Sequence, residues 1–382
     1  MSPEIESYTI IHPLGFSAKD VFDSIVEGKS GLKELRKDFL EHPVYAAYFS
    51  EEQNNRLKML CPFEGWNRFE RLIWSAGKEV LEKSGISFND KVLVIVATTK
   101  GGIEEIETNP SAANLNIHLS VKKVIDKLST EYGNIAGKKP PFYIVSNACV
   151  SGLSAMIAGK RFLEAQDYDY AVIIGADTVN DFVLSGFNSL FALSDQLCRP
   201  FDKARNGINL GEGAAAVVLR RNSDNHFNHN KIYLTGGATT NDANHISGPS
   251  RTGEELAEAI KKAVNEADSN TFDFLSAHGT ATIYNDEMES KAFAEAGVSD
   301  IPVHSLKQYA GHTLGAAGVM ESVICIESLV NNILIPSLGY SDCGTSSKLN
   351  IQTKLENREM TRFIKTMSGF GGCNAAVCFE KR

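Results

Sequence analysis

The sequence predicts an α/β protein built from two similar halves, each with a largely parallel sheet. One observation is that short apolar runs alternate with segments whose apolar residues recur at helical spacing. The other is that four segments of the first half reappear in the second half in the same order. A chain of 382 residues is long enough for two domains, and we expect them at 1–225 and 226–382, around the polar segment 222–230.

The repeated segments predict which elements correspond. An amphipathic helix at 67–85 precedes the strand and turn KVLVIVATTKGG (91–102), as a helix at 254–268 precedes FDFLSAHGTAT (272–282). A strand, a turn and a helix rich in small residues are predicted at 141–159 and again at 301–320. Each half closes on a similar strand, AAVVL (215–219) or AAVCF (375–379). The small residues predict two closely packed helices, which we expect to lie between two sheets.

Composition excludes several classes of function. A net charge of −9 argues against general nucleic-acid binding. No apolar run approaches the roughly 20 residues that span a bilayer, and the first residues do not resemble a signal peptide. The seven cysteines are dispersed, without metal-binding spacing, so we expect reduced thiols, no metal and a cytoplasmic location.

Three residues that could carry chemistry follow predicted strands. Cys149 comes after the apolar run PFYIV (141–145), at the expected start of a helix, where free N–H groups favour a thiolate. This stretch alone leaves a buried structural cysteine equally open. His278 and His312 each follow a strand, beside glycines, in turns of the second half. Because open α/β sheets place their sites at the carboxyl ends of strands, we expect these three side chains to converge.

Five motifs together carry a resemblance to a known family. They are NACVSG, RPFDKARNGINLGEGAA, HGTATIYND, KQYAGHTLGAAGVMES and SGFGGCNAAV. In this order they resemble the elongating β-ketoacyl-[acyl-carrier-protein] synthases, condensing enzymes of the thiolase fold, over nearly the whole chain. The resemblance implies duplicated α/β halves in a five-layer α-β-α-β-α sandwich. It also implies a homodimer, or a heterodimer with a related chain-length-determining subunit.

The resemblance implies a role for each site residue. Cys149 would take an acyl group from a carrier-protein thioester, while His278 and His312 would stabilise the enolate formed as malonyl thioester loses carbon dioxide. The buried Lys307 and its partner Glu321 would orient His312. Thr280 and Thr282 would bind the phosphopantetheine arm of the carrier protein; no other cofactor is implied. Phe370 would gate the acyl pocket, on a loop freed by Gly371 and Gly372, and its N–H and that of Cys149 would hold an oxyanion.

Some positions depart from the family pattern. Lys100 stands where an apolar residue usually lines the acyl pocket, and a surface lysine is the alternative. Asn206 replaces a usual Asp, Ser368 an often-found Phe, and Cys373, beside the gate, is interpreted as a packing residue. Acidic carrier protein is expected on a local basic patch, for which the candidates are Arg68, Arg71, Lys122, Lys123, Lys203 and Arg205.

Two other functions remain open for such a chain. One is a same-fold acyltransferase or thiolase that uses coenzyme A thioesters. The other is a non-catalytic partner subunit that sets chain length; such partners commonly lack the nucleophile, so Cys149 argues against it.

Overall fold

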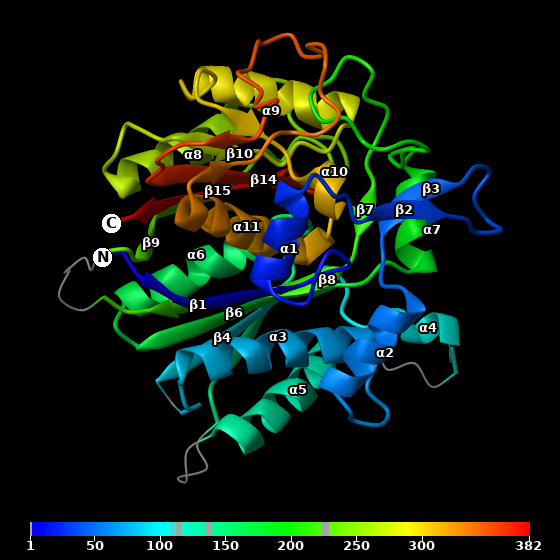
Figure 1. Cartoon of the computed structure of the whole chain (residues 1–382), viewed down its shortest axis with the longest axis vertical. Helices are drawn as coiled ribbons and strands as arrows, with labels where there is room; N and C mark the ends of the chain where they lie inside the picture. Colours follow the sequence, from blue (N-terminus) through cyan, green and yellow to red (C-terminus); the bar gives the residue numbers. More distant parts are fainter. Residues whose placement is uncertain (1, 90, 109, 112–115, 134–138, 223–228) are drawn as a thin grey trace.

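The protein is built around one ten-stranded sheet that folds into two stacked halves (Figure 1). The computed structural model describes residues 2–89, 91–108, 110–111, 116–133, 139–222 and 229–382. The first half of the sheet consists of β1 (Glu4–Ile11), β8 (Gly213–Arg220), β6 (Tyr170–Asp177), β4 (Val92–Ala97) and β5 (Phe142–Val145). The second consists of β9 (Ile232–Asn241), β15 (Cys373–Lys381), β14 (Arg362–Gly369), β10 (Phe274–Ser276) and β11 (Val303–His304).

The two halves have the same strand order and the same strand directions. The first runs β1-β8-β6-β4-β5 and the second β9-β15-β14-β10-β11. In each, the first two pairings are antiparallel and the last two are parallel. Only one residue pair, Glu4 with Tyr233, joins β1 to β9. The predicted duplication is therefore confirmed strand by strand, but each half of the sheet is mixed, with two antiparallel pairings, rather than largely parallel as expected.

Helices complete five layers, as the resemblance implied (Figure 1). One outer layer holds α3 (Arg68–Ser84) and α5 (Ile117–Tyr132), and the other α8 (Glu254–Ala267) and α9 (Ile283–Glu295). The central layer contains α6 (Ser151–Glu164) and α11 (Ala317–Asn331), flanked by α1 (Ala18–Val26). The remaining elements are β2 (Leu32–Leu35), β3 (Val44–Ala47), α2 (Glu51–Leu60), α4 (Glu105–Thr108), α7 (Asp181–Ser189), β7 (Leu210–Gly211), α10 (Lys307–Ala310), the 3-10 turn η1 (Leu314–Ala316), β12 (Ile333–Leu334) and β13 (Glu356–Asn357).

Small residues let the two central helices touch backbone to backbone. A Cβ atom added to Gly318 of α11 would lie 2.6 Å from the backbone nitrogen of Leu153, and one on Gly152 of α6 would lie 2.8 Å from that of Val319. Neither distance leaves room for a side chain. The stretch Leu314–Asn331 is apolar and long enough to cross a bilayer, but 83% of it is buried inside the protein, as in a core helix.

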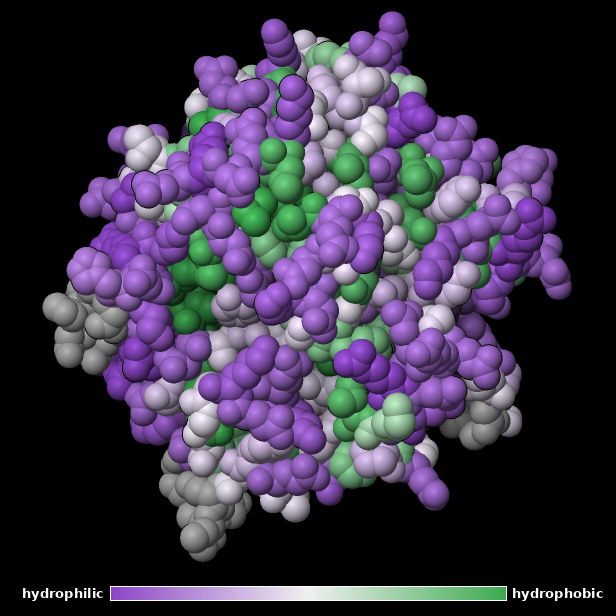
Figure 2. All heavy atoms as spheres, viewed as in Figure 1, coloured by the Kyte–Doolittle hydropathy of each residue, from purple (hydrophilic) through white to green (hydrophobic). Residues whose placement is uncertain are grey.

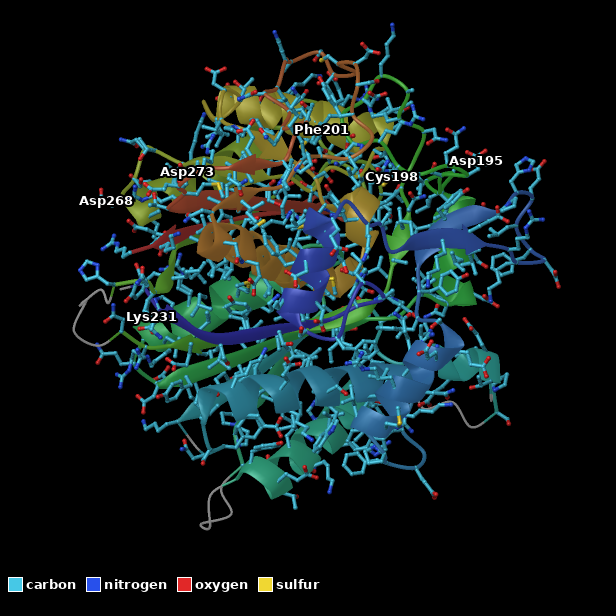
Figure 3. The ribbon with its side chains drawn as sticks, in the orientation of Figure 1. Asp195, Cys198, Phe201, Lys231, Asp268 and Asp273 are labelled. Carbon is cyan, nitrogen blue, oxygen red and sulfur yellow. The ribbon has the colours of Figure 1, made fainter. Side chains whose placement is uncertain are left out.

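The chain ends meet beside the start of the second half. Pro3 accepts a hydrogen bond from Leu234, at 3.0 Å, and Arg382 donates one to Lys231, at 2.9 Å. Lys231 lies on the same side of the molecule as the two termini (Figures 1 and 3). The surface in this view is mostly hydrophilic, with smaller hydrophobic areas between the hydrophilic side chains (Figure 2).

Candidate active site

Cys149 lies on a tight turn between β5 and α6. Ala148, immediately before it, has a φ of 43°, a strained value for a residue with a side chain. Ser151 holds this turn, because its hydroxyl accepts from the N–H of Asn147 at 2.8 Å and donates to the carbonyl of Ala148 at 2.6 Å. The turn aims the thiol away from the helix and into the interior, where Cys149 is buried.

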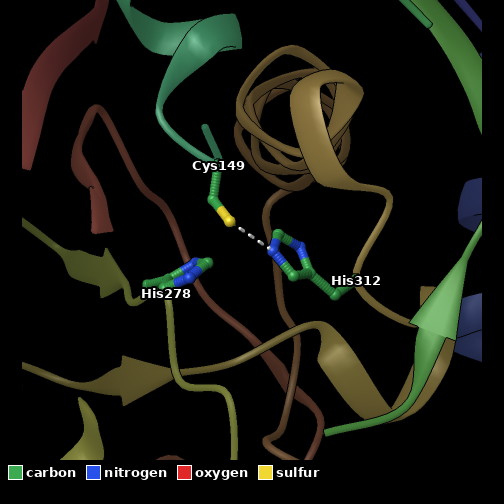
Figure 4. Close-up of side chains that lie close together, drawn as sticks. All are labelled: Cys149, His278 and His312. Atoms are coloured by element: carbon green, nitrogen blue, oxygen red, sulfur yellow. Dashed lines mark hydrogen bonds between the residues drawn. The ribbon is translucent and has the colours of Figure 1, made fainter. Parts of the chain in front are cut away.

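The second half of the chain brings both histidines to this thiol (Figure 4). His312 Nε2 lies 2.9 Å from Cys149 Sγ, and the rings of His278 and His312 are 5.0 Å apart at 78°. His278 follows β10, and His312 precedes α11 in the turn that corresponds to the one carrying Cys149. The predicted convergence of the three residues is thus observed.

Burial affects the pKa of the Cys149 thiol more strongly than the nearby helix N-terminus does. Burial raises the pKa of the Cys149 thiol to about 12, and Asp177 adds to the shift, although Lys307, Lys100 and the N–H of Phe370 oppose it. The expected preference for a thiolate is therefore not met in the resting site. The thiol is neutral there, and the hydrogen bond with His312 and the N–H of Phe370 support the sulfur as negative charge develops.

Both histidines are neutral hydrogen-bond donors. Burial lowers the pKa of each well below its usual 6.5, and the nearby Lys307 and Lys365 lower it further. Neither Nδ1 atom has a hydrogen-bond partner among the described residues. A proton on Nδ1 would be a buried, unpartnered donor, so the proton belongs on Nε2, which faces the cavity.

The same three residues could hold a metal ion, which their sequence spacing did not predict. Their ligand atoms all lie within 4.8 Å of one another. Metal-bound histidines, however, normally donate their second ring N–H to an acceptor. Within the described residues both Nδ1 atoms lack such a partner, so the arrangement fits hydrogen-bond donation better than a resident metal.

Lys307 and Glu321 form the buried ion pair that the resemblance implied, and a second lysine joins them. The Lys307 ammonium contacts one carboxylate oxygen of Glu321, and Lys365 Nζ lies 2.6 Å from the other. All three side chains are almost fully buried. Although burial opposes it, the two ammonium groups hold the pKa of Glu321 below its usual range. Lys365 was missed by sequence analysis; a lysine within the apolar run RFIKTM was the available signal.

Two buried carboxylates fix the turn that carries His278. Glu289 accepts from the backbone N–H groups of His278 and Gly279 at 2.8 and 2.7 Å, and Asp286 accepts from that of Thr280 at 3.0 Å. Burial raises the pKa of Glu289 to about 7 and that of Asp286 to about 6. Neither carboxylate was predicted from the sequence; the available signal was a pair of acidic residues three positions apart on the helix that follows His278.

A cavity of about 500 Å³ opens in front of the three residues. Thr280 and Thr282 line it, 2.8 Å apart through their hydroxyl oxygens. Phe370 also lines it, is 38% exposed and packs against Phe187 with ring centroids 5.7 Å apart. The cavity therefore leads from the surface, past two hydroxyl groups and an aromatic side chain, to the thiol.

The loop of Phe370 contains the two predicted glycines. Gly371 and Gly372 have φ values of 83° and 75°, which favour glycine over other residues. A Cβ on Gly372 would lie 2.1 Å from Asp242, whereas one on Gly371 would meet only the Cys373 sulfur at 4.0 Å. Cys373 donates to Asn147 at 2.8 Å, on the segment that leads to the nucleophile.

Lys100 has a carboxylate partner in its own chain. Its ammonium lies 3.1 Å from Asp177, which is fully buried and also accepts from Thr98, Thr99 and Gly315. With its side chain only 10% exposed, Lys100 is not the free surface lysine that was the alternative. Lys100 does not line the cavity described above, and its place in an acyl pocket stays a prediction.

Most of the expected basic patch is engaged in internal contacts. Arg68 pairs with the buried Glu212, at 3.2 Å, and Lys123 with Glu70, at 2.7 Å. Arg71 donates to backbone carbonyls, Lys122 pairs with Asp126, and the side chain of Arg205 is only 6% exposed. Lys203 is exposed, and no ion pair involves it within the described residues, so the six cations do not act as one free patch.

Comparison with known proteins assigns the chain to a family. Residues 5–225 match the N-terminal domain of beta-ketoacyl synthases and residues 233–341 match the C-terminal domain. The 3-oxoacyl-[acyl-carrier-protein] synthase 2 of Vibrio cholerae is 29% identical over 80% of this chain and 81% of its own length. The enzyme of the same name from Vibrio harveyi is 26% identical over 97% and 96%.

Solved structures share the fold. The ishigamide ketosynthase/chain length factor matches with a TM-score of 0.85 at 21% identity, over 100% of this chain and 99% of that one. A ketosynthase from Xenorhabdus doucetiae, in complex with its chain length factor, matches at 0.79 and 24%, over 100% and 98%. With the two domain matches covering most of the sequence, this chain belongs to the beta-ketoacyl synthase family.

Proposed function

We propose that the protein catalyses decarboxylative Claisen condensation of malonyl-carrier protein with an acyl group bound to Cys149. The product is a 3-oxoacyl-carrier protein, in fatty-acid or polyketide chain elongation. The observation that carries this proposal is one thiol facing two neutral imidazoles at the end of a single cavity.

The first half-reaction loads the enzyme. Cys149 Sγ attacks the acyl thioester, the new S–C bond forms, and the carrier thiol leaves with the thiol proton. His312 Nε2–H, 2.9 Å from the sulfur, stabilises the charge that develops there. The paired hydroxyls of Thr280 and Thr282 supply donors and acceptors for the amide groups of a phosphopantetheine arm.

The second half-reaction makes the new carbon–carbon bond. The carboxylate–carbon bond of the malonyl group breaks, carbon dioxide leaves, and the electron pair forms an enolate whose oxygen accepts from His278 and His312. The enolate carbon then attacks the acyl-cysteine. The N–H groups of Cys149 and Phe370 hold the tetrahedral oxyanion, which collapses and expels the Cys149 thiolate; the thiolate takes a proton from water.

We also propose a dimer that forms through β5. This strand ends its half of the sheet, and none of its four residues is fully buried, with Tyr143 48% exposed. An apolar edge strand of this kind invites pairing with a strand of another chain. The partner is a second copy or a related ketosynthase-like subunit, such as the chain length factor that accompanies the ketosynthase in two structural relatives. We place the enzyme in the cytoplasm, because all seven cysteines are free thiols.

Intact-mass spectrometry with acyl- and malonyl-carrier proteins tests the proposed reaction. We expect an acyl adduct on the wild type and on Cys343→Ala, which removes an exposed thiol outside the site, and no adduct on Cys149→Ala. Malonyl-carrier protein should then release carbon dioxide and give a 3-oxoacyl product. Turnover with coenzyme A thioesters alone would instead support the acyltransferase, and no adduct on any variant would support the non-catalytic subunit.

A further inference from the structure

Lys365 forms a buried charge cluster with Lys307 and Glu321. Unlike those two residues, it lies in none of the five family motifs. It lies on β14, directly opposite Ser276 of β10, and its side chain is fully buried. Its ammonium donates to the carbonyls of Ser276 and Ala277, at 3.2 and 3.0 Å. Ala277 immediately precedes His278, so Lys365 holds the end of the strand that presents this histidine.

Glu321 connects this anchor to the other histidine. Its carboxylate contacts Lys365 through one oxygen and Lys307 through the other. Lys307 begins the short helix α10, and its carbonyl accepts from the N–H of Gly311, at 2.9 Å, one residue before His312. A continuous set of contacts thus runs from the His278 turn through Lys365, Glu321 and Lys307 to the His312 turn.

The cluster also supplies positive charge; burial lowers the pKa of Lys365, and the Glu321 carboxylate opposes that shift. Two ammonium groups and one carboxylate leave a net charge of +1 in the interior, beside two neutral imidazoles. In a low-dielectric interior such a charge favours an anion formed between the imidazoles. Other ionisable groups interact with the cluster: Cys325 of α11, His304 of β11 and Glu289 of α9.

We propose that Lys365 is a positioning residue for decarboxylation, which ties the two histidine turns together through Glu321 and supplies the positive charge of the cluster. This proposal rests on the proposed function. It predicts that loss of Lys365 impairs decarboxylation, which uses both histidines and forms an anion between them, much more than acylation of Cys149, which uses His312 alone. A merely structural role would impair both steps alike.

The test compares Lys365→Met with Lys381→Met, a matched control. Lys381 lies on the adjacent strand β15 and donates to the carbonyl of Leu329, away from the histidines. In a Cys149→Gln background, carbon dioxide release from malonyl-carrier protein should fall roughly 10- to 100-fold for Lys365→Met, the loss expected of misplaced donors. With Cys149 intact, acyl-enzyme formation should change less than about threefold, and the control should match its parent in both assays.

A second readout follows the imidazoles directly. With 13C-labelled histidine rings, the titration midpoints of His278 and His312 should rise in Lys365→Met, because a nearby positive charge is gone. If Lys365→Met does not fold, Lys365→Gln replaces it, because its side chain keeps an amide donor for the carbonyl of Ala277. The reaction rates and the histidine midpoints are then measured on that variant. Unchanged midpoints, or equal losses in decarboxylation and acylation, would overturn the proposal. A Cys149→Gln parent that releases no carbon dioxide would refute the proposed function, while the midpoints would still decide the role of Lys365.

Discussion

Replacing Gly318 with alanine should misplace the catalytic groups without touching any of them. A Cβ there would lie 2.6 Å from the backbone nitrogen of Leu153, whereas ordinary contacts begin at 3.4 Å. The obstacle is backbone, which cannot rotate aside, so α6 and α11 must separate by roughly 1 Å. Because Cys149 precedes α6 and His312 precedes α11, this movement acts on the 2.9 Å contact between sulfur and imidazole.

The expected magnitudes follow from that separation. Overpacking of this kind costs about 1–3 kcal/mol, offset by about 1 kcal/mol because alanine favours a helix over glycine. A net loss of up to about 2 kcal/mol should lower the thermal unfolding midpoint. A 1 Å displacement of reacting groups can cost about 100-fold in rate, so we expect a loss of that order in acyl-enzyme formation.

Gly186→Ala provides the matched control. Gly186 lies in α7, and nothing lies within 4 Å of its added Cβ. This variant should be as stable as the wild type or more stable, by up to about 1 kcal/mol, with unchanged acylation. Thermal unfolding and single-turnover acylation, followed by intact mass, measure both variants. If Gly318→Ala behaves like Gly186→Ala in the two assays, the close packing of α6 and α11 does not set the site geometry.

Three further predictions follow from the site. Cys149→Gln should release carbon dioxide from malonyl-carrier protein while forming no acyl-enzyme, since the histidines remain. If this variant released no carbon dioxide, the role assigned to the histidines would be contradicted. Lys100→Met should lower the thermal midpoint by removing the partner of the buried Asp177, at a cost of roughly 3 kcal/mol, and adding Asp177→Asn should recover part of it. If Lys100 borders the acyl pocket, Lys100→Met should also raise relative turnover of long saturated acyl chains, and an unchanged preference would remove it from the pocket. Glu289, with its pKa raised from 4.5 to about 7, contributes stability that is complete below pH 4.5 and lost as the pH rises through 7. Glu289→Gln should therefore change the slope of the thermal midpoint against pH in that window, and parallel curves would contradict the assignment.

Periodicity and repeated segments predicted the elements that carry the site. The strand-turn-helix units around Cys149 and His312, and the turn after β10, were recognisable because apolar runs end abruptly at small residues. Their convergence followed from strand direction, because the carboxyl ends of parallel strands share an edge. The family resemblance then supplied the roles of Lys307 and Glu321, whose contact the structure contains.

Contacts between distant segments could not be predicted in the same way. The pairing of Lys100 with Asp177 and of Lys365 with Glu321 depends on register and on packing across layers, which one sequence does not specify. The prediction of a thiolate at Cys149 was wrong for a related reason. A helix terminus is a local feature, whereas burial depends on the whole fold, and burial has the larger effect on its pKa.

Because the two chain ends lie close together, the two halves could follow each other along the polypeptide in either order. Pro3 and Arg382 both hydrogen-bond to β9 or to the residue just before it, from opposite sides. The strands β1 and β15 flank β9, so the ends are roughly two strand spacings, about 10 Å, apart. A linker of about four residues spans this gap. A circular permutant that starts at Lys231 would keep every strand pairing and still bring a nucleophile from one half to the imidazoles of the other, although the histidines would then be synthesised first.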